Sequence, residues 1–195
     1  MNSEFLIITA QTINNIINLN LNKIYDAVLN AYIAHGEKKV VNPPSYFLKF
    51  PNKDKSRIIA LPALITQNPR MAGIKWISSN PDNIKIDLKR ASAVIILNDY
   101  ETGYPIACLE GAVISALRTV YSAILVSNLL VPNKTKRTVG IVGSGNISKQ
   151  FISCLKNQDW NIEVIKLFDL NAKACIKLKS FQPNYYLRGG AVDGT

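Results

Sequence analysis

Histidine and cysteine are scarce in this chain of 195 residues, and their scarcity excludes several kinds of active site. His35 is the one histidine, so an HExxH metal site cannot be assembled, and a lone histidine at a helix end suits neither a Ser-His-Asp nor a Cys-His pair. Cys108, Cys154 and Cys175 are widely spaced and include no CxxC pair. We therefore expect no metal site, and unpaired thiols of this kind are typical of a reducing cytoplasm.

Targeting and membrane-spanning segments are also missing from the pattern. No basic region precedes the short apolar run Leu6–Ile8, which argues against a secretory signal. The longest uncharged apolar stretch, Thr119–Asn133, is too short to cross a bilayer. We expect a cytoplasmic protein with no membrane partner.

Acidic residues are few, with 13 Asp and Glu against 23 Lys and Arg, and the formal net charge is +10. Such an excess suits anionic partners, either nucleic acid or a small anion. The basic residues are dispersed, however, and the one dense cluster, Lys134–Arg137, has no aromatic residues between its members. We therefore predict no nucleic-acid partner.

What is present is a glycine turn between an apolar strand and a helix, in the run Thr138-Val-Gly-Ile-Val-Gly-Ser-Gly-Asn-Ile-Ser148. Gly143 permits the tight turn, and Gly145 removes a side chain that would keep a pyrophosphate off the backbone. The helix that begins near Ile147 would offer unpaired N–H groups to the phosphates. The pattern predicts a dinucleotide site, with a turn used only for packing as the alternative.

Asp169 supports the dinucleotide interpretation. It ends a second apolar run, Ile162–Phe168, about one helix further along the chain. An acid in this place accepts hydrogen bonds from the ribose 2′-hydroxyl and repels a 2′-phosphate. We therefore expect NAD rather than NADP.

The preceding residues alternate between helical and strand-like patterns. Helices are expected near Ile13 and from a cap at Asn22 to Gly36, followed by a long helix at about Leu109–Leu130. Runs divided by prolines predict strands, and the turn Asp99–Gly103 predicts a hairpin. The predicted strands are Leu6–Ile8, Tyr46–Phe50, Arg57–Leu61, Met71–Ile77, Ala93–Asn98 and Tyr104–Cys108.

Three cations stand in apolar or small-residue surroundings. Lys75, and less clearly Lys49, either extends to water at a sheet edge or is held in a pocket to bind an anion. Arg118 lies in a stripe of small residues along the long helix, with Gly111, Ser115 and Ser122. It either makes a surface ion pair or clamps a carboxylate or pyrophosphate.

The link after Leu130, with Pro132 and the basic cluster, marks a domain boundary. We expect an α/β protein with a mixed-sheet domain at 1–130 and the start of a Rossmann domain at 131–195. Two strands are clear in the second part, where a complete dinucleotide fold has about six.

Several motifs in register resemble the ornithine cyclodeaminase/mu-crystallin family over roughly residues 8 to 179. They are Gly73–Ile77, Arg90–Asp99, Gly103–Ile106, Ser115–Thr119 and Gly140–Gly145. The sequence of residues 90–99 is most similar to that of the family branch that forms L-2,3-diaminopropionate for siderophores. The resemblance implies a substrate and dimerisation domain followed by an NAD-binding Rossmann domain, and a homodimer through the first.

The resemblance also implies roles for single residues. Lys75 matches the family lysine at the substrate carboxylate, which makes it our candidate catalytic residue, and Arg118 matches an arginine that contacts both substrate and cofactor. Lys49 stands where the family has a further arginine, so it keeps the charge and loses the bidentate fork. The implied cofactor contacts are Arg90, Arg118, Thr119, Gly143, Ser144, Gly145, Asn146, Ile147 and Asp169.

The implied reaction is the NAD-dependent oxidation of an amino-acid C–N bond followed by imine hydrolysis, with N-(2-amino-2-carboxyethyl)-L-glutamate as the expected substrate. Ornithine cyclodeamination and a non-catalytic ligand-binding module are the alternatives. The family's acid/base aspartate belongs to a later strand than the sequence supplies. We therefore expect a truncated member, with non-family residues after about Ser180.

Overall fold

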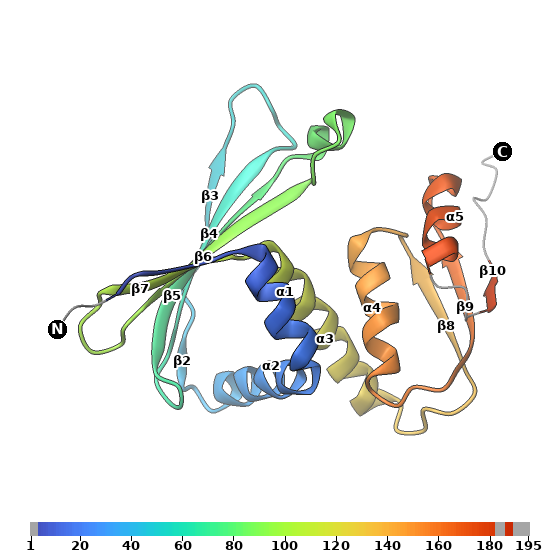
Figure 1. Ribbon diagram of the computed structural model, residues 1–195, viewed down its shortest axis with the longest axis horizontal. Coiled ribbons are helices and arrows are strands. Elements are labelled where there is room, and N and C mark those ends of the chain that lie inside the picture. The colour runs from blue at the N-terminus through green and yellow to red at the C-terminus, as the bar shows by residue number, and fades with distance from the viewer. Residues whose placement is uncertain (1–3, 182–185, 189–195) are drawn as a thin grey trace. The chain divides into compact units, whose positions relative to one another are not determined.

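The computed structural model describes residues 4–181 and 186–188, and its contacts divide the chain into two compact units, Met1–Ser115 and Ala116–Thr195 (Figure 1). This division lies inside the long helix α3 (Ala112–Leu130), earlier than the boundary expected after residue 130. The part of α3 from Ala116 onward belongs to the second unit, where Tyr121 interacts with the side chain of Cys154. The buried residues of this part include Val120, Tyr121 and Ile124.

The first unit is built on a seven-stranded mixed sheet in the order β1-β7-β6-β5-β4-β2, with β3 also paired to β4. All neighbours are antiparallel except β1 and β7, which are parallel. The strands are β1 (Leu6–Ile8), β2 (Val40–Val41), β3 (Tyr46–Lys49), β4 (Arg57–Ile65), β5 (Met71–Ser79), β6 (Ala91–Asn98) and β7 (Pro105–Glu110). The predicted strands and the β6–β7 hairpin are confirmed.

Strand β4 continues past the proline at which the sequence predicts its end. β3 pairs with residues 57–60 of β4 and β2 pairs with residues 64–65, so neither strand covers Pro62. On its other side Pro62 lies opposite Ile74 of β5. Proline is tolerated at such a gap because its missing N–H faces no partner strand.

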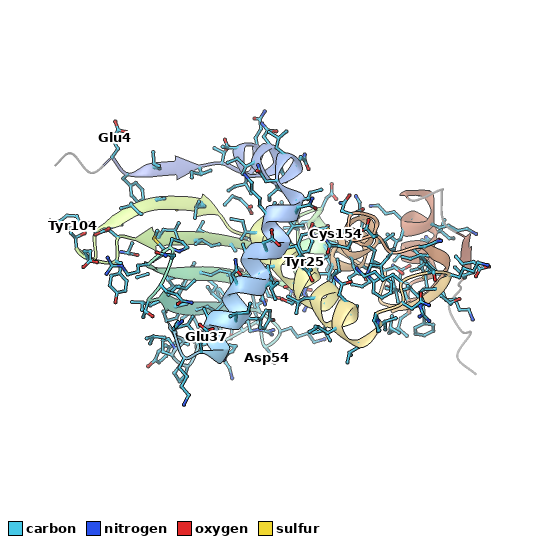
Figure 2. The ribbon with its side chains drawn as sticks, turned by 90° about the horizontal axis from the view of Figure 1, so that it is seen from below. Glu4, Tyr25, Glu37, Asp54, Tyr104 and Cys154 are labelled. Carbon is cyan, nitrogen blue, oxygen red and sulfur yellow. The ribbon has the colours of Figure 1, made fainter. Side chains whose placement is uncertain are left out.

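Helices α1 (Ala10–Leu19) and α2 (Leu21–Gly36) belong to the first unit, where α1 contacts β7. Figure 2 shows α2 running across the strands, with Tyr25 in its first half and Glu37 just after its end. The side chain of Thr9 caps α1, and α2 ends at Gly36, as predicted for that helix. The cap predicted at Asn22 is wrong, since α2 already begins at Leu21 after Asn20, whose side chain makes no cap bond.

Helix α3 begins later than predicted because Leu109 belongs to β7, where it pairs with both Ile95 and Ile8. The Glu110 carboxylate then accepts hydrogen bonds from the N–H groups of Ala112 (2.8 Å) and Val113 (3.2 Å), which caps the helix. By length and composition alone α3 could cross a membrane, with a mean hydropathy of 1.6. Core helices of soluble proteins meet the same criterion, so this is weak evidence of a membrane span.

The second unit contains a three-stranded parallel sheet in the order β10-β9-β8, made by β8 (Arg137–Val142), β9 (Ile162–Phe168) and β10 (Tyr186–Arg188). Helices α4 (Asn146–Lys156) and α5 (Ala172–Phe181) connect them. The interpretation that only two strands are visible is wrong, because β10 adds a third beside β9. The order is that of the first half of a Rossmann fold.

The core of the second unit gathers one face of this sheet and the inner sides of its helices. Ile165 and Leu167 of β9 are buried with Ile152 and Leu155 of α4. The end of α3 is fixed to the same unit, since Trp160 Nε1 donates to Asn128 Oδ1 at 2.8 Å. This packing leaves the β8–α4 turn at the carboxyl end of the strands, where ligands of such sheets bind.

Candidate functional site

The glycine turn of the second unit joins β8 to α4 in a conformation that depends on Gly143. This residue has φ +92°, which favours glycine, and its N–H donates to Phe168 O at 2.7 Å. The hydroxyl of Ser148 donates to Gly143 O, so Ser148 ties the first turn of α4 back to the loop. The turn is therefore held by its own residues in the shape that the sequence predicts.

The conformation of Gly145, unlike that of Gly143, does not require glycine. Its backbone is extended (φ −84°, ψ −169°), which any residue adopts, and a Cβ built there would meet no atom within 4 Å. Neither backbone strain nor packing therefore requires glycine at this position. The open space lies at the N-terminus of α4, where no side chain makes a cap bond, and this is where a phosphate would approach the backbone.

Asp169 lies directly beside this turn. Its Oδ2 accepts a hydrogen bond from Ser144 N at 2.6 Å, and its Oδ1 accepts one from Asn171 N at 2.8 Å. The N–H groups of Asn171 and then Ser144 hold the pKa of the Asp169 carboxyl below its usual range. The carboxylate is thus charged and fixed, and its remaining lone pairs can accept from a ribose hydroxyl.

The residues of the turn that the sequence predicts to contact phosphate differ in whether their N–H groups are available. Ser144 directs its N–H to Asp169, so that group already has an acceptor inside the protein. Asn146 and Ile147 lie in the first turn of α4, and with the cap residue Gly145 they supply N–H groups that no intrahelical carbonyl accepts. Gly145, Asn146 and Ile147 therefore fit a diphosphate better than Ser144 does.

Lys75 lies in β5, inside the sheet of the first unit. The strand has neighbours on both sides, with Leu61 and Ile95 opposite Lys75, so extension to water at a sheet edge is excluded. The side chain is half-buried, and its Nζ donates to Ser115 Oγ of α3 at 3.0 Å. A half-buried ammonium oriented by a hydroxyl is a suitable contact for an anionic ligand.

Lys49 and Arg90 belong to the same unit, and both are exposed. Lys49 ends β3 opposite Arg57, while Arg90 precedes β6 and its Nε donates to Ser79 Oγ at 3.4 Å. These two residues therefore lie beside the C-terminal end of β5, beyond Lys75. Their substrate and cofactor roles stay predictions.

Arg118 and Thr119 lie on α3 in the second unit. The Arg118 side chain is exposed, and its backbone carbonyl accepts a hydrogen bond from Ser122 Oγ at 2.6 Å. Gly111 of the same predicted stripe lies before the helix, where a Cβ would lie 3.0 Å from Ile95 Cγ1, so its size serves packing against β6. A joint contact of Lys75 and Arg118 with one substrate would involve both units and stays a prediction.

Sequence reasoning missed two polar residues near these positions. Glu110 was placed inside the predicted helix Leu109–Leu130, although an acid just before Gly111 and an apolar helix is a signal for a cap. Arg57 was counted only as a strand residue, because its neighbours across the sheet are distant in sequence. Within the described residues, 4–181 and 186–188, no group of acids, histidines and cysteines could hold a metal ion.

Similarity to known proteins identifies the kind of molecule that carries this turn and this lysine. The ornithine cyclodeaminase/mu-crystallin family matches residues 5–185. The chain belongs to this family. The match continues past Ser180, and the predicted non-family tail lies largely outside the described residues.

Individual relatives agree with this membership. The chain is 35% identical over 163 residues to N-((2S)-2-amino-2-carboxyethyl)-L-glutamate dehydrogenase of Staphylococcus aureus, which covers 81% of this chain and 48% of the relative. It is 28% identical over 178 residues to alanine dehydrogenase of Archaeoglobus fulgidus, with coverages of 91% and 52%. The chain therefore spans about half the length of these curated relatives.

Solved structures share the fold. Δ(1)-pyrroline-2-carboxylate reductase of Thermococcus litoralis, in complex with NADH and L-proline, superimposes with a TM-score of 0.86 at 22% identity and covers 96% of this chain and 57% of its own. An archaeal alanine dehydrogenase dimer with bound NAD gives a TM-score of 0.79 at 25% identity, with coverages of 96% and 56%. The α/β architecture with a mixed sheet is confirmed.

Proposed function

We propose that this chain is part of an enzyme that oxidises an amino-acid C–N bond with NAD and hydrolyses the resulting imine. The observation that carries the proposal is the space at Gly145, which the fold leaves open beside the uncapped N-terminus of α4 and the charged Asp169. A glycine that neither strain nor packing explains is accounted for by a phosphate at that point. The archaeal relative with bound NAD supports the choice of coenzyme.

The residues present fit NAD. Gly145, Asn146 and Ile147 would hold the diphosphate through backbone N–H groups, and Asp169 would accept from the adenosine ribose. We propose Arg118 and Thr119 as further coenzyme contacts, with Arg118 also facing the substrate. For Arg90 the family resemblance implies a coenzyme contact as well, which competes with a contact to the substrate. When bound, NAD supplies the acceptor for the hydride that leaves the substrate carbon.

The work of the first unit in this reaction is to bind and orient the amino acid. The Lys75 ammonium would pair with the carboxylate on the reacting carbon, and Ser115 would keep that ammonium in place. A fixed carboxylate restricts rotation of the carbon whose hydrogen is removed. Water then adds to the C=N carbon, and the C–N bond breaks as the amine leaves.

We further propose N-(2-amino-2-carboxyethyl)-L-glutamate as the substrate, supported by the 35% identity to the Staphylococcus aureus dehydrogenase. The reaction would consume this secondary amine, NAD⁺ and water and yield L-2,3-diaminopropionate, 2-oxoglutarate, NADH and a proton. This would place the enzyme in cytoplasmic siderophore biosynthesis. Ornithine cyclodeamination is the second candidate, favoured by relatives of that name at 26 to 27% identity.

A homodimer through the first unit is proposed on the opposite face of the sheet from Lys75. Tyr46, Ala60, Trp76 and Val94 lie in one row across four strands. Trp76 and Val94, on the central strands β5 and β6, are each 41% exposed, which is unusual in the middle of a sheet, and Tyr46 on the edge strand β3 is 75% exposed. Sedimentation equilibrium tests the proposal, since a mass of one chain at micromolar concentration would exclude the dimer.

The function is tested by substrate-dependent NADH formation. We expect turnover of the condensed glutamate compound by a chain extended to the length of the relatives, and little with ornithine. In the 195-residue chain, Lys75→Met should weaken binding of the amino acid about 30-fold, roughly 2 kcal/mol, and leave NAD affinity within twofold. Unchanged amino-acid binding in this variant would remove Lys75 from the site.

A further inference from the structure

Strand pairing brings three basic residues together at one end of the sheet in the first unit. Lys49 of β3 lies opposite Arg57 of β4, and Arg57 lies opposite Ser79 of β5. Both pairings are continuous there, without a register shift, and paired residues project from the same face. The hydrogen bond from Arg90 Nε to Ser79 Oγ adds a third cation to this row.

This basic row, Lys49, Arg57 and Arg90 around Ser79, lies on the same face of the sheet as Lys75. Ser79 follows Lys75 by four residues on one strand, and side chains two or four apart project from one face. The backbone separation along the strand is about 13 Å. Between the two positions lies an apolar pair, Ile59 and Ile77. Along this face Lys75 is therefore followed by the apolar pair and then by the basic row.

In the part of the chain that the structure describes, Lys49, Arg57 and Arg90 form no ion pair. Other exposed cations of the same unit do find acids, as Arg70 does with Glu101 at 2.6 Å and Lys85 with Asp82 at 2.7 Å. Like charges gathered on one face repel one another, and an anion bound among them relieves that repulsion. All three side chains are exposed, so a ligand from solution can reach them.

We infer that the basic row binds a second carboxylate of the substrate, remote from the carboxylate at Lys75. The inference rests on the proposed function and specifies its substrate class, an amino acid with an acid group at its far end. Arg57 supplies the planar guanidinium group that Lys49 lacks, which can bind a carboxylate with two hydrogen bonds. The apolar pair Ile59 and Ile77 accommodates the methylene groups between the two acids. A substrate with a terminal ammonium, such as ornithine, would be repelled by the same row.

L-glutamate and L-glutamine are suitable probes because they have nearly the same shape and differ in the charge of the terminal group. Titration calorimetry of the 195-residue chain with NAD present should show about tenfold tighter binding of glutamate, which is about 1.4 kcal/mol. In Arg57→Ala this preference should fall to about one, while glutamine binding stays within twofold. Lys85→Ala removes another exposed cation of the same unit, outside the row, and should keep the preference.

Each other outcome is decisive. Equal weakening of both probes by Arg57→Ala, or an unchanged preference, would overturn the subsite while the proposed function stands. A loss of NAD affinity with the preference intact would assign the row to the coenzyme and also overturn it. If the wild-type chain binds neither probe, the proposed function itself fails and the subsite fails with it.

Discussion

Gly73 in the first unit and Gly145 in the second are both glycines of family motifs, yet their surroundings are opposite. A Cβ built on Gly73 would lie 2.6 Å from the backbone oxygen of Ile96 on the neighbouring strand. A Cβ built on Gly145 would meet nothing within 4 Å. Gly73 is small because the protein occupies the space, whereas Gly145 leaves a space that the protein does not occupy.

The two regions therefore prepare for their ligands in different ways. The sheet around Gly73 is closely packed and presents charge through long side chains such as Lys75. The turn around Gly145 presents backbone N–H groups and keeps side chains away. A carboxylate is bound by point charges that a sheet holds in place, and a diphosphate by a backbone that approaches it closely.

One substitution made in both regions tests this contrast, and its largest effect is expected at Gly145. Gly145→Ala should weaken NAD binding about 100-fold, roughly 2.7 kcal/mol, because the methyl group occupies the space proposed for the diphosphate. The melting temperature should not fall, since the extended backbone accepts alanine and no atom lies near the new Cβ. Titration with NAD and thermal unfolding measure the two quantities.

Gly140→Ala is the matched control. Gly140 lies in β8, just before the turn, and a Cβ there also meets no atom within 4 Å. It should bind NAD as the wild type does. Equal NAD affinity in the Gly145 and Gly140 variants would show that the space at Gly145 is not a phosphate site.

Gly73→Ala should have the converse effect on stability. The Cβ would overlap Ile96 O and lie 3.3 Å from Leu97 Cδ2, so the β5–β6 pairing must shift. We expect a loss of about 2 kcal/mol in the free energy of unfolding, measured by urea denaturation, against no loss for Gly140→Ala. An unchanged unfolding midpoint would mean that the sheet adjusts freely at this position.

The glycine turn could be read from the sequence because it is local. Gly143, Gly145 and Ser148 are neighbours in the chain, and a strand followed by a helix brings Asp169 to the turn through a single βαβ unit. The hairpin is equally local, and it was equally predictable. The hydrogen bond between Ser144 and Asp169 was not predicted, because it depends on the conformation that closes the turn.

The basic row could not be read in this way. Lys49, Arg57 and Arg90 lie on three different segments, and only the register of β3, β4 and β5 brings them together. A shift of one residue in that register would send Arg57 to the other face. Pro62 was taken as a strand end for the same reason. The sequence does not show that β3 and β2 pair with β4 on either side of Pro62 and leave Pro62 itself without a partner on that edge.

The smallest expected effect concerns coenzyme choice at Asp169. Asp169→Asn keeps an acceptor oxygen beside the turn and removes the charge that would repel a 2′-phosphate. The ratio of NADP to NAD dissociation constants should fall about tenfold, measured by titration with both coenzymes. Glu163→Gln, on β9, makes the same change of net charge away from the turn and should leave the ratio unaltered.

The same carboxylate makes the stability of the turn depend on pH, and the direction of the change follows from the pKa of Asp169. Hydrogen bonds from Asn171 N and Ser144 N lower the pKa of Asp169 in the folded chain, so its contribution to stability is present above the ordinary value of 3.8 and is lost as pH falls through the lower folded pKa. The Ser144 amide resonance should therefore stay constant from pH 7 to about 4 and move only below that. In Asp169→Asn the movement should disappear, and a Ser144 amide that still shifts in this variant would trace the pH dependence to another group.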